Sequence, residues 1–184
     1  HLAMLRSLPN YMVFRPCDTR ETAAGWYAAL THTTTPTGLI LSRQNMPALE
    51  GTGKDALKGA YILRDCEGTP DVLLMASGSE VELIYKAYDE LAAKGVKARV
   101  ISMPCWELFA EQSDEYKESV MPKAVRARLA VEAAADFGWH KFVGLDGDVI
   151  CMNGFGASAP AGTLFKDFGF TVEQVVERAM ALVK

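Results

Sequence analysis

The chain has 184 residues, of which 49% are hydrophobic and 23% are charged, an ordinary composition for a globular protein. Its formal net charge of −4 lacks the basic surplus of a general nucleic-acid or anionic-membrane binder, so neither partner is expected. The length suits one domain, or one domain with part of another.

The first fifty residues predict a strand-helix-strand unit. Asp18 and Glu21 form a capping box that opens the helix, and the apolar run Leu39–Leu41 predicts a strand buried on both faces. A two-stranded sheet cannot cover its own faces, so we expect a piece of a longer chain, as the start at His1 also indicates. The expected elements are a helical stretch at 1–8, a strand at 11–15, a helix at 19–30 and a strand at 37–42.

The remainder predicts a more complete α/β domain. Residues 46–58 break the pattern with Pro, Gly and polar residues, and we place a linker at 51–58, between a partial unit at 1–50 and a domain at 59–184. Alternating strands and helices predict a mostly parallel open sheet with helices on both faces. Strands are expected at 59–64, 72–76, 96–103, 128–133 and 149–152. Helices are expected from 81 to Gly95, at 106–110, at 114–120 and at 172–183, with capping boxes at Ser77–Glu80 and Thr171–Gln174.

Arg43 is the leading candidate for a binding residue. It follows the carboxyl end of a predicted strand, where ligands bind in open α/β sheets. Its guanidinium fork matches two oxygens of a phosphate or carboxylate. The residues alone leave a second interpretation open, a surface arginine with a solvated charge.

Two other segments are weaker candidates. Gly154–Ala159 fits the pattern Gly-x-Gly-x-x-Ala, but Pro160 follows at once, so we favour a structural turn over a dinucleotide site. Ser77-Gly78-Ser79 lies between a strand and a helix, where exposed amides can bind an anion. We expect the capping box to satisfy those amides instead.

No catalytic triad or metal-ligand spacing is visible. The histidines stand at 1, 32 and 140, and the cysteines at 17, 66, 105 and 151 form no Cys-x-x-Cys pair. We expect buried free thiols in a reducing compartment. Asp146-Gly147-Asp148 predicts a turn between two strands. The aromatic residues Trp106, Phe109, Trp139 and Phe142 are expected in a core or an interface.

Eight stretches together resemble the transketolases, and the resemblance covers essentially all 184 residues. The most specific is Ser42–Pro47, which is similar to a loop of that family. The others are His1–Arg6, Val13–Asp18, Lys58–Tyr61, Ala76–Val81, Ser102–Phe109, Phe137–Trp139 and Phe155–Pro160. Alternatives are a piece of another thiamine enzyme, such as deoxyxylulose-phosphate synthase or a 2-oxo acid dehydrogenase subunit, and a non-catalytic association or regulatory module.

The resemblance implies the end of the pyrimidine-binding domain followed by the C-terminal domain of a transketolase. Such an enzyme uses thiamine diphosphate and a divalent cation (Mg or Ca) to move a two-carbon ketol unit from a ketose phosphate to an aldose phosphate. It implies a cytoplasmic homodimer of the pentose phosphate pathway. Arg43 matches the family's arginine for the substrate phosphate. Catalytic, cofactor-binding and metal-binding residues are expected upstream, so none is assigned here and the fragment alone is expected to be inactive.

Overall fold

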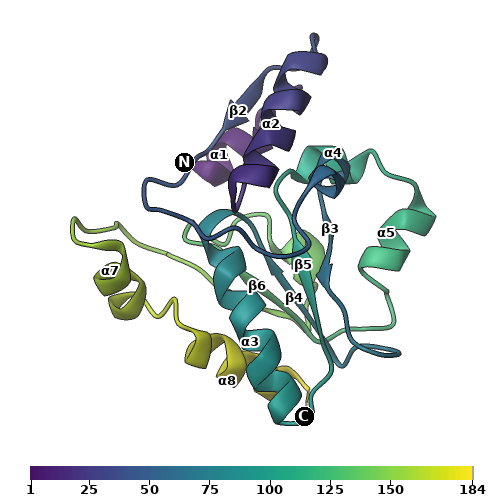
Figure 1. Ribbon diagram of the computed structural model, residues 1–184, viewed down its shortest axis with the longest axis vertical. Coiled ribbons are helices and arrows are strands. Elements are labelled where there is room, and N and C mark those ends of the chain that lie inside the picture. Colours follow the sequence, from purple (N-terminus) through teal and green to yellow (C-terminus); the bar gives the residue numbers. More distant parts are fainter. Residues whose placement is uncertain (184) are drawn as a thin grey trace.

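The computed structural model describes residues 1–183, which form two sheets. The small sheet pairs β1 (Met12–Phe14) with β2 (Thr37–Leu39) in parallel. It lies with α1 (Leu2–Arg6) and α2 (Thr19–Thr31) above the larger sheet in Figure 1. Asp18 Oδ1 accepts a hydrogen bond from the Glu21 amide at 2.9 Å, which confirms the predicted cap of α2.

The larger sheet has the strand order β3-β5-β4-β6-β7. Its pairs are parallel except for the antiparallel edge strand β3, so the predicted mostly parallel sheet is confirmed. Every residue of the central strand β4 is buried. The strands are β3 (Tyr61–Arg64), β4 (Val72–Ala76), β5 (Ala98–Ser102), β6 (Arg128–Val131) and β7 (Asp148–Ile150).

Helices cover both faces of the larger sheet, as predicted. Leu74 points into a core shared with α3 (Val81–Ala93) and α8 (Val172–Leu182). Its neighbours Leu73 and Met75 point to the other face, into a cluster with α4 (Trp106–Ala110) and α6 (His140–Val143). Figure 1 shows α5 (Asp114–Val120) and α7 (Ala161–Asp167) at the sides. Short 3₁₀ turns occupy Lys54–Lys58 and Gly78–Glu80.

The small sheet is covered less completely, and the predicted burial of Leu39–Leu41 is wrong. Leu39 is half-buried and Leu41 is 54% exposed, and the strand ends at Leu39. The physical reason is that β2 is an edge strand that pairs only with β1, in a sheet of two strands. Trp26 and Leu30 on the outer side of α2 are also exposed.

Three local predictions need correction. The capping box at Ser77–Glu80 does not form, because both side chains are engaged elsewhere in the chain. Asp146–Asp148 joins α6 to β7 and does not join two strands. The helices α6 and α7 were not among the expected elements. The cap at Thr171 is confirmed, since its hydroxyl accepts a hydrogen bond from the Gln174 amide at 3.2 Å.

No helix in the described part of the chain combines the length and the apolar character needed to cross a membrane.

Candidate functional site

Arg43 lies in an irregular loop that follows β2. Its side chain is exposed and makes no hydrogen bond or ion pair with residues 1–183. It lines a cavity of about 650 Å³ together with Gln44 and the segment 157–161 that leads into α7. Of the side chains lining this cavity, only those of Arg43, Gln44 and Ser158 are polar, and none carries a carboxylate. The cavity therefore presents one unpaired positive charge, which suits an anionic group.

The segment 154–159 does not build a dinucleotide site. Its residues form an irregular loop, and α7 begins only at Ala161, after Pro160. A dinucleotide fingerprint opens a helix directly, so the dinucleotide interpretation fails, and the structural turn that we expected here is an irregular loop instead. The sequence did not predict that part of this segment lines the Arg43 cavity, because no periodicity connects positions more than a hundred residues apart.

The segment Ser77-Gly78-Ser79, considered above as an anion site, lies against the positively charged side chain of Arg15. The Arg15 guanidinium donates to the Ser77 carbonyl oxygen and, through Nη1, to Glu80 Oε2 at 2.6 Å. Gly78 has φ +58°, and a Cβ there would lie 2.6 Å from the Arg15 guanidinium carbon. Arg15 follows β1, so this contact joins the small sheet to the larger one.

A second arginine, Arg6, is paired with Glu132, which follows β6. This pair belongs to the same junction between the two sheets. Arg6 donates to both of its carboxylate oxygens, at 2.6 and 2.8 Å, and the Trp139 indole nitrogen donates at 2.8 Å. Ser77 Oγ donates to the same carboxylate at 2.5 Å. Burial by itself raises the pKa of Glu132, but the hydrogen bonds and charges of Arg6 and Arg15 hold that pKa below its usual range. These contacts make a buried structural junction.

Glu21 makes a third connection between the two sheets, without a cation. Its carboxylate accepts hydrogen bonds from the Tyr61 hydroxyl at 2.7 Å, the Ser102 hydroxyl at 2.5 Å and the Cys17 amide at 2.7 Å. It is fully buried. Burial raises the pKa of Glu21, and the three hydrogen bonds oppose that rise only in part.

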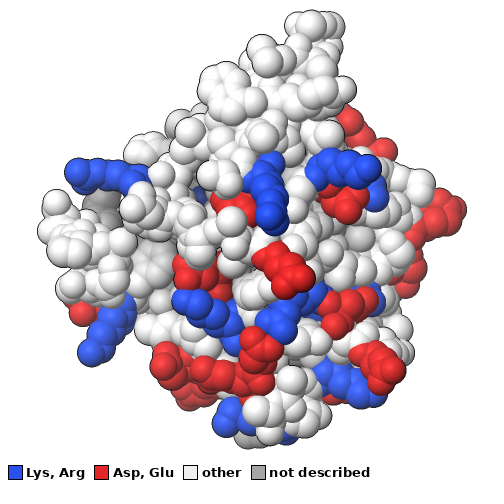
Figure 2. Space-filling model, viewed as in Figure 1, with Lys and Arg blue, Asp and Glu red and all other residues white. Residues whose placement is uncertain are grey.

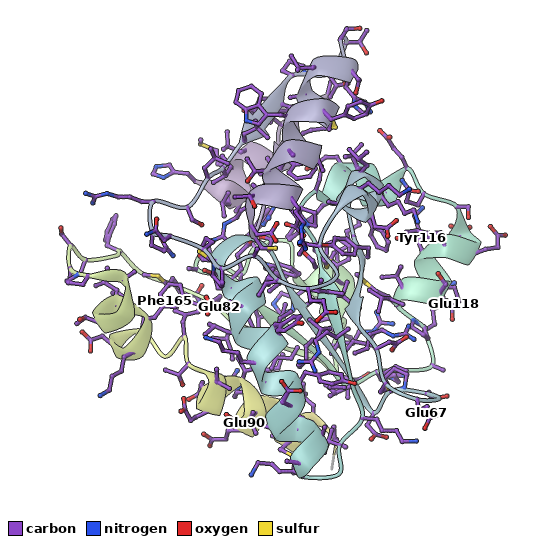
Figure 3. The ribbon with its side chains drawn as sticks, in the orientation of Figure 1. Glu67, Glu82, Glu90, Tyr116, Glu118 and Phe165 are labelled. Atoms are coloured by element: carbon purple, nitrogen blue, oxygen red, sulfur yellow. The ribbon has the colours of Figure 1, made fainter. Side chains whose placement is uncertain are left out.

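The aromatic residues lie in the core, as predicted. The Trp106 ring meets Trp139 edge-to-face with centroids 4.8 Å apart, and the Arg6 guanidinium lies 3.7 Å from the centre of the same ring. Figure 3 shows Phe165 of α7 and Glu82 of α3 near each other, and both line a cavity of about 610 Å³. That cavity also contains Lys86, whose charge is paired with Glu82.

The histidines and cysteines form no reactive group. His32 lies with Nδ1 2.9 Å from the Ala28 carbonyl oxygen, and His140 Nε2 lies 4.0 Å from Asp136. The four cysteines are free thiols, but only Cys17 and Cys105 are buried as expected, while Cys66 and Cys151 are half-buried. Burial raises the pKa of Cys17 and Cys105. Within residues 1–183 there is no group of three or more His, Cys, Asp or Glu side chains that could hold a metal ion.

Comparison with known protein families gives two successive matches, separated by residues 49–58. The transketolase pyrimidine-binding domain matches residues 1–48, and the transketolase-like C-terminal domain matches residues 59–171. The chain belongs to the transketolase family.

Individual relatives agree over nearly the whole chain. A transketolase of Halalkalibacterium halodurans is 49% identical over 187 aligned positions, which cover 100% of this chain and 28% of the relative. The solved transketolase of Leishmania mexicana superposes with a TM-score of 0.93 at 43% identity, over 99% of this chain and 26% of that structure. A Pichia stipitis transketolase, solved as a complex with sedoheptulose 7-phosphate, superposes with a TM-score of 0.92 at 43% identity. This match covers 99% of this chain and 26% of that structure. This chain thus spans about a quarter of the length of these relatives.

Transketolases as a family imply thiamine diphosphate and a divalent cation, and the described residues do not fit a complete site for either. They lack a cluster of metal ligands, and Arg43, which makes neither a hydrogen bond nor an ion pair with them, lies in an open loop. The alternative of another thiamine enzyme is also disfavoured, because the relatives that align with the whole of this chain are transketolases.

Proposed function

We propose that this chain is the carboxyl-terminal part of a transketolase. Residues 1–50 would be the end of the pyrimidine-binding domain, 51–58 a linker, and 59–184 the C-terminal domain. The two family matches and the quarter-length coverage of the relatives support this division. The division also agrees with the two sheets, since the break between them falls between β2 and β3.

The complete enzyme would transfer a two-carbon ketol unit from a ketose phosphate to an aldose phosphate, in the pentose phosphate pathway. It would use thiamine diphosphate with Mg or Ca, and it would work as a homodimer in the cytoplasm. The sugar-phosphate complex of the Pichia stipitis relative supports the substrate class. The free thiols support a reducing compartment.

Within this enzyme Arg43 would bind the phosphate of the sugar. The observation that carries this proposal is an unpaired guanidinium in a cavity without any carboxylate. A guanidinium fork binds two phosphate oxygens at once. The phosphate is remote from the reacting carbon, so the contact would be equal in the ground and transition states and would lower KM without changing kcat.

The test is Arg43→Ala in the complete enzyme. Loss of a charge-assisted hydrogen bond costs about 1.5–3 kcal/mol, which corresponds to a loss of about 10- to 100-fold in kcat/KM for phosphorylated donors. We expect this loss in KM. Arg43→Lys should recover only part of it, because a point charge does not reproduce the fork.

The control donor is hydroxypyruvate, which has no phosphate. Both variants should process it with KM and kcat close to those of the parent enzyme. If Arg43→Ala lowers kcat/KM equally for the two donors, Arg43 supports the fold or the cofactor and the proposal is wrong.

The isolated chain should have no ketol-transfer activity and no measurable affinity for thiamine diphosphate. The described residues provide no cluster of metal ligands, and the rest of the relatives' length is absent from this chain. Calorimetric titration with the cofactor and magnesium measures this directly. Saturable binding in the micromolar range would contradict it.

A further inference from the structure

The loop that carries Arg43 is held at its two ends. At one end the Ile40 amide donates to the Phe14 carbonyl oxygen at 2.9 Å, and at the other end Leu49 is buried. Between these points residues 41–48 form no hydrogen bond with the described part of the chain. The position of Arg43 therefore depends on the two anchors.

Asp18 makes the second anchor. Its Oδ2 accepts hydrogen bonds from the Leu49 amide at 3.2 Å and from the Thr52 hydroxyl at 2.6 Å, while Oδ1 caps α2. Asp18 and Thr52 are 3% and 7% exposed, so water does not compete strongly for these bonds. One carboxylate thus ties the chain after the Arg43 loop to the start of a helix.

Leu49 itself packs into the apolar core, but the part of the loop before it is not fixed by packing. A cavity of about 370 Å³ lies between the start of α2 and the loop, lined on one side by Asp18 and Thr22 and on the other by Ser42 and Gln44. Because this space is not filled by side chains, the inner side of the loop lacks the close contacts that fix a packed segment.

The start of α2 is itself fixed to the larger sheet. Glu21, one turn after Asp18, accepts hydrogen bonds from Tyr61 on β3 and Ser102 on β5. A continuous path of hydrogen bonds therefore runs from the larger sheet, through the first turn of α2, to the end of the Arg43 loop.

We propose that Asp18 is a positioning residue for Arg43. By fixing residues 49 and 52 it sets where the guanidinium lies in its cavity, and so determines how well the enzyme binds a phosphorylated ketose. This inference rests on the proposed role of Arg43. Asp18 acts through the loop and does not touch the substrate.

Two substitutions in the complete enzyme test this role. Thr52→Val removes one hydrogen bond to Asp18 while it preserves the shape of the side chain and the cap of α2. Asp18→Ser still caps the helix but is too short to reach residues 49 and 52. Each should raise KM for sedoheptulose 7-phosphate about 2- to 10-fold, with the larger rise for Asp18→Ser. KM for hydroxypyruvate and both kcat values should stay unchanged.

The matched control is Thr171→Val. Thr171 caps α8, so the same change removes a hydrogen-bonded hydroxyl on an element that does not line the Arg43 cavity. This control should leave the KM values for both donors unchanged. Thr52→Val keeps the test decisive if Asp18→Ser does not fold.

The dependence on Arg43 is tested by combining Thr52→Val with Arg43→Ala. If the anchor acts through Arg43, Thr52→Val should no longer change KM in the Arg43→Ala background. Equal losses for the two donors would overturn the positioning role. If Arg43→Ala is donor-selective and the two anchor variants are not, this inference alone fails. If Arg43→Ala is not donor-selective, the proposed function fails as well.

Discussion

The two sheets of this chain differ in how they are held in place. The larger sheet is covered by helices on both faces, and its central strand β4 is buried throughout. In the small sheet β1 is also buried and contacts α1 and α4, but β2 is only half-buried, and Trp26, Leu30 and Leu41 remain exposed at 54%, 73% and 54%. Figure 2 shows that the surface over this upper unit carries almost no charge on the visible face. The proposed binding residue Arg43 thus belongs to the less completely covered part.

Buried polar contacts join the small sheet to the larger one, beside an apolar core that the two share. Arg6 and Arg15 are paired with Glu132 and Glu80, and Glu21 binds the strands of the larger sheet. Buried charges are costly when one partner is lost, because the other is then left without water or a counter-charge. Removing any one partner of the junction should therefore destabilise the folded chain.

The strongest way to break this arrangement is Glu132→Gln in the isolated chain. It leaves Arg6 without its carboxylate, and loss of one partner of a buried pair costs about 3–5 kcal/mol. Urea unfolding measures the change. The matched control is Glu82→Gln, which removes an exposed pair with Lys86 and should cost about 0.3–0.5 kcal/mol. Equal costs for the two substitutions would mean that the junction does not stabilise the chain.

A second test follows the buried carboxyl group of Glu21 by pH. The raised pKa of Glu21 means that the folded chain binds its proton more tightly than the unfolded chain, so this group lowers stability as pH rises above about 4.5. Glutamine does not ionise, so the variant Glu21→Gln does not lose stability in this way as pH rises. The free energy of unfolding of the variant, relative to the parent, should therefore increase with pH, by at most about 1.4 kcal/mol per pH unit. Urea unfolding from pH 4 to 8 measures it, and a constant difference would show that Glu21 does not titrate in this way.

The smallest expected change in stability concerns the exposed apolar side of α2. Contiguous exposed apolar residues favour association, so the isolated chain should form a dimer or larger species. The double substitution Trp26→Gln and Leu30→Gln should reduce that association and change stability by only about 0.5 kcal/mol, because both positions are exposed. Light scattering at increasing concentration measures it. A parent chain that remains monomeric throughout would contradict the expectation.

The sequence predicted those features that depend on neighbouring residues. Apolar runs located β4 and its parallel neighbours, and the caps at Asp18 and Thr171 follow from local spacing. The four-residue helix α6 is too short for a periodic pattern. The box at Ser77–Glu80 failed because Glu80 pairs with Arg15, 65 positions away in the sequence.

The same distinction between local and long-range features applies to the candidate site. Arg43 could be proposed as a binding residue from the rule that ligands bind at the carboxyl ends of parallel strands. Its cavity partners at 157–161 and its anchor at Asp18 depend on long-range packing, which no local spacing encodes. The burial of Leu41 was wrong for a related reason, because exposure depends on what lies next to the strand.

The most direct test of this account is a crystal structure of the complete enzyme with a ketose phosphate bound. We expect phosphate oxygens about 2.7–2.9 Å from the Arg43 guanidinium nitrogens, in the cavity between the Arg43 loop and residues 157–161. A phosphate bound by other residues, with Arg43 directed into solvent, would contradict it.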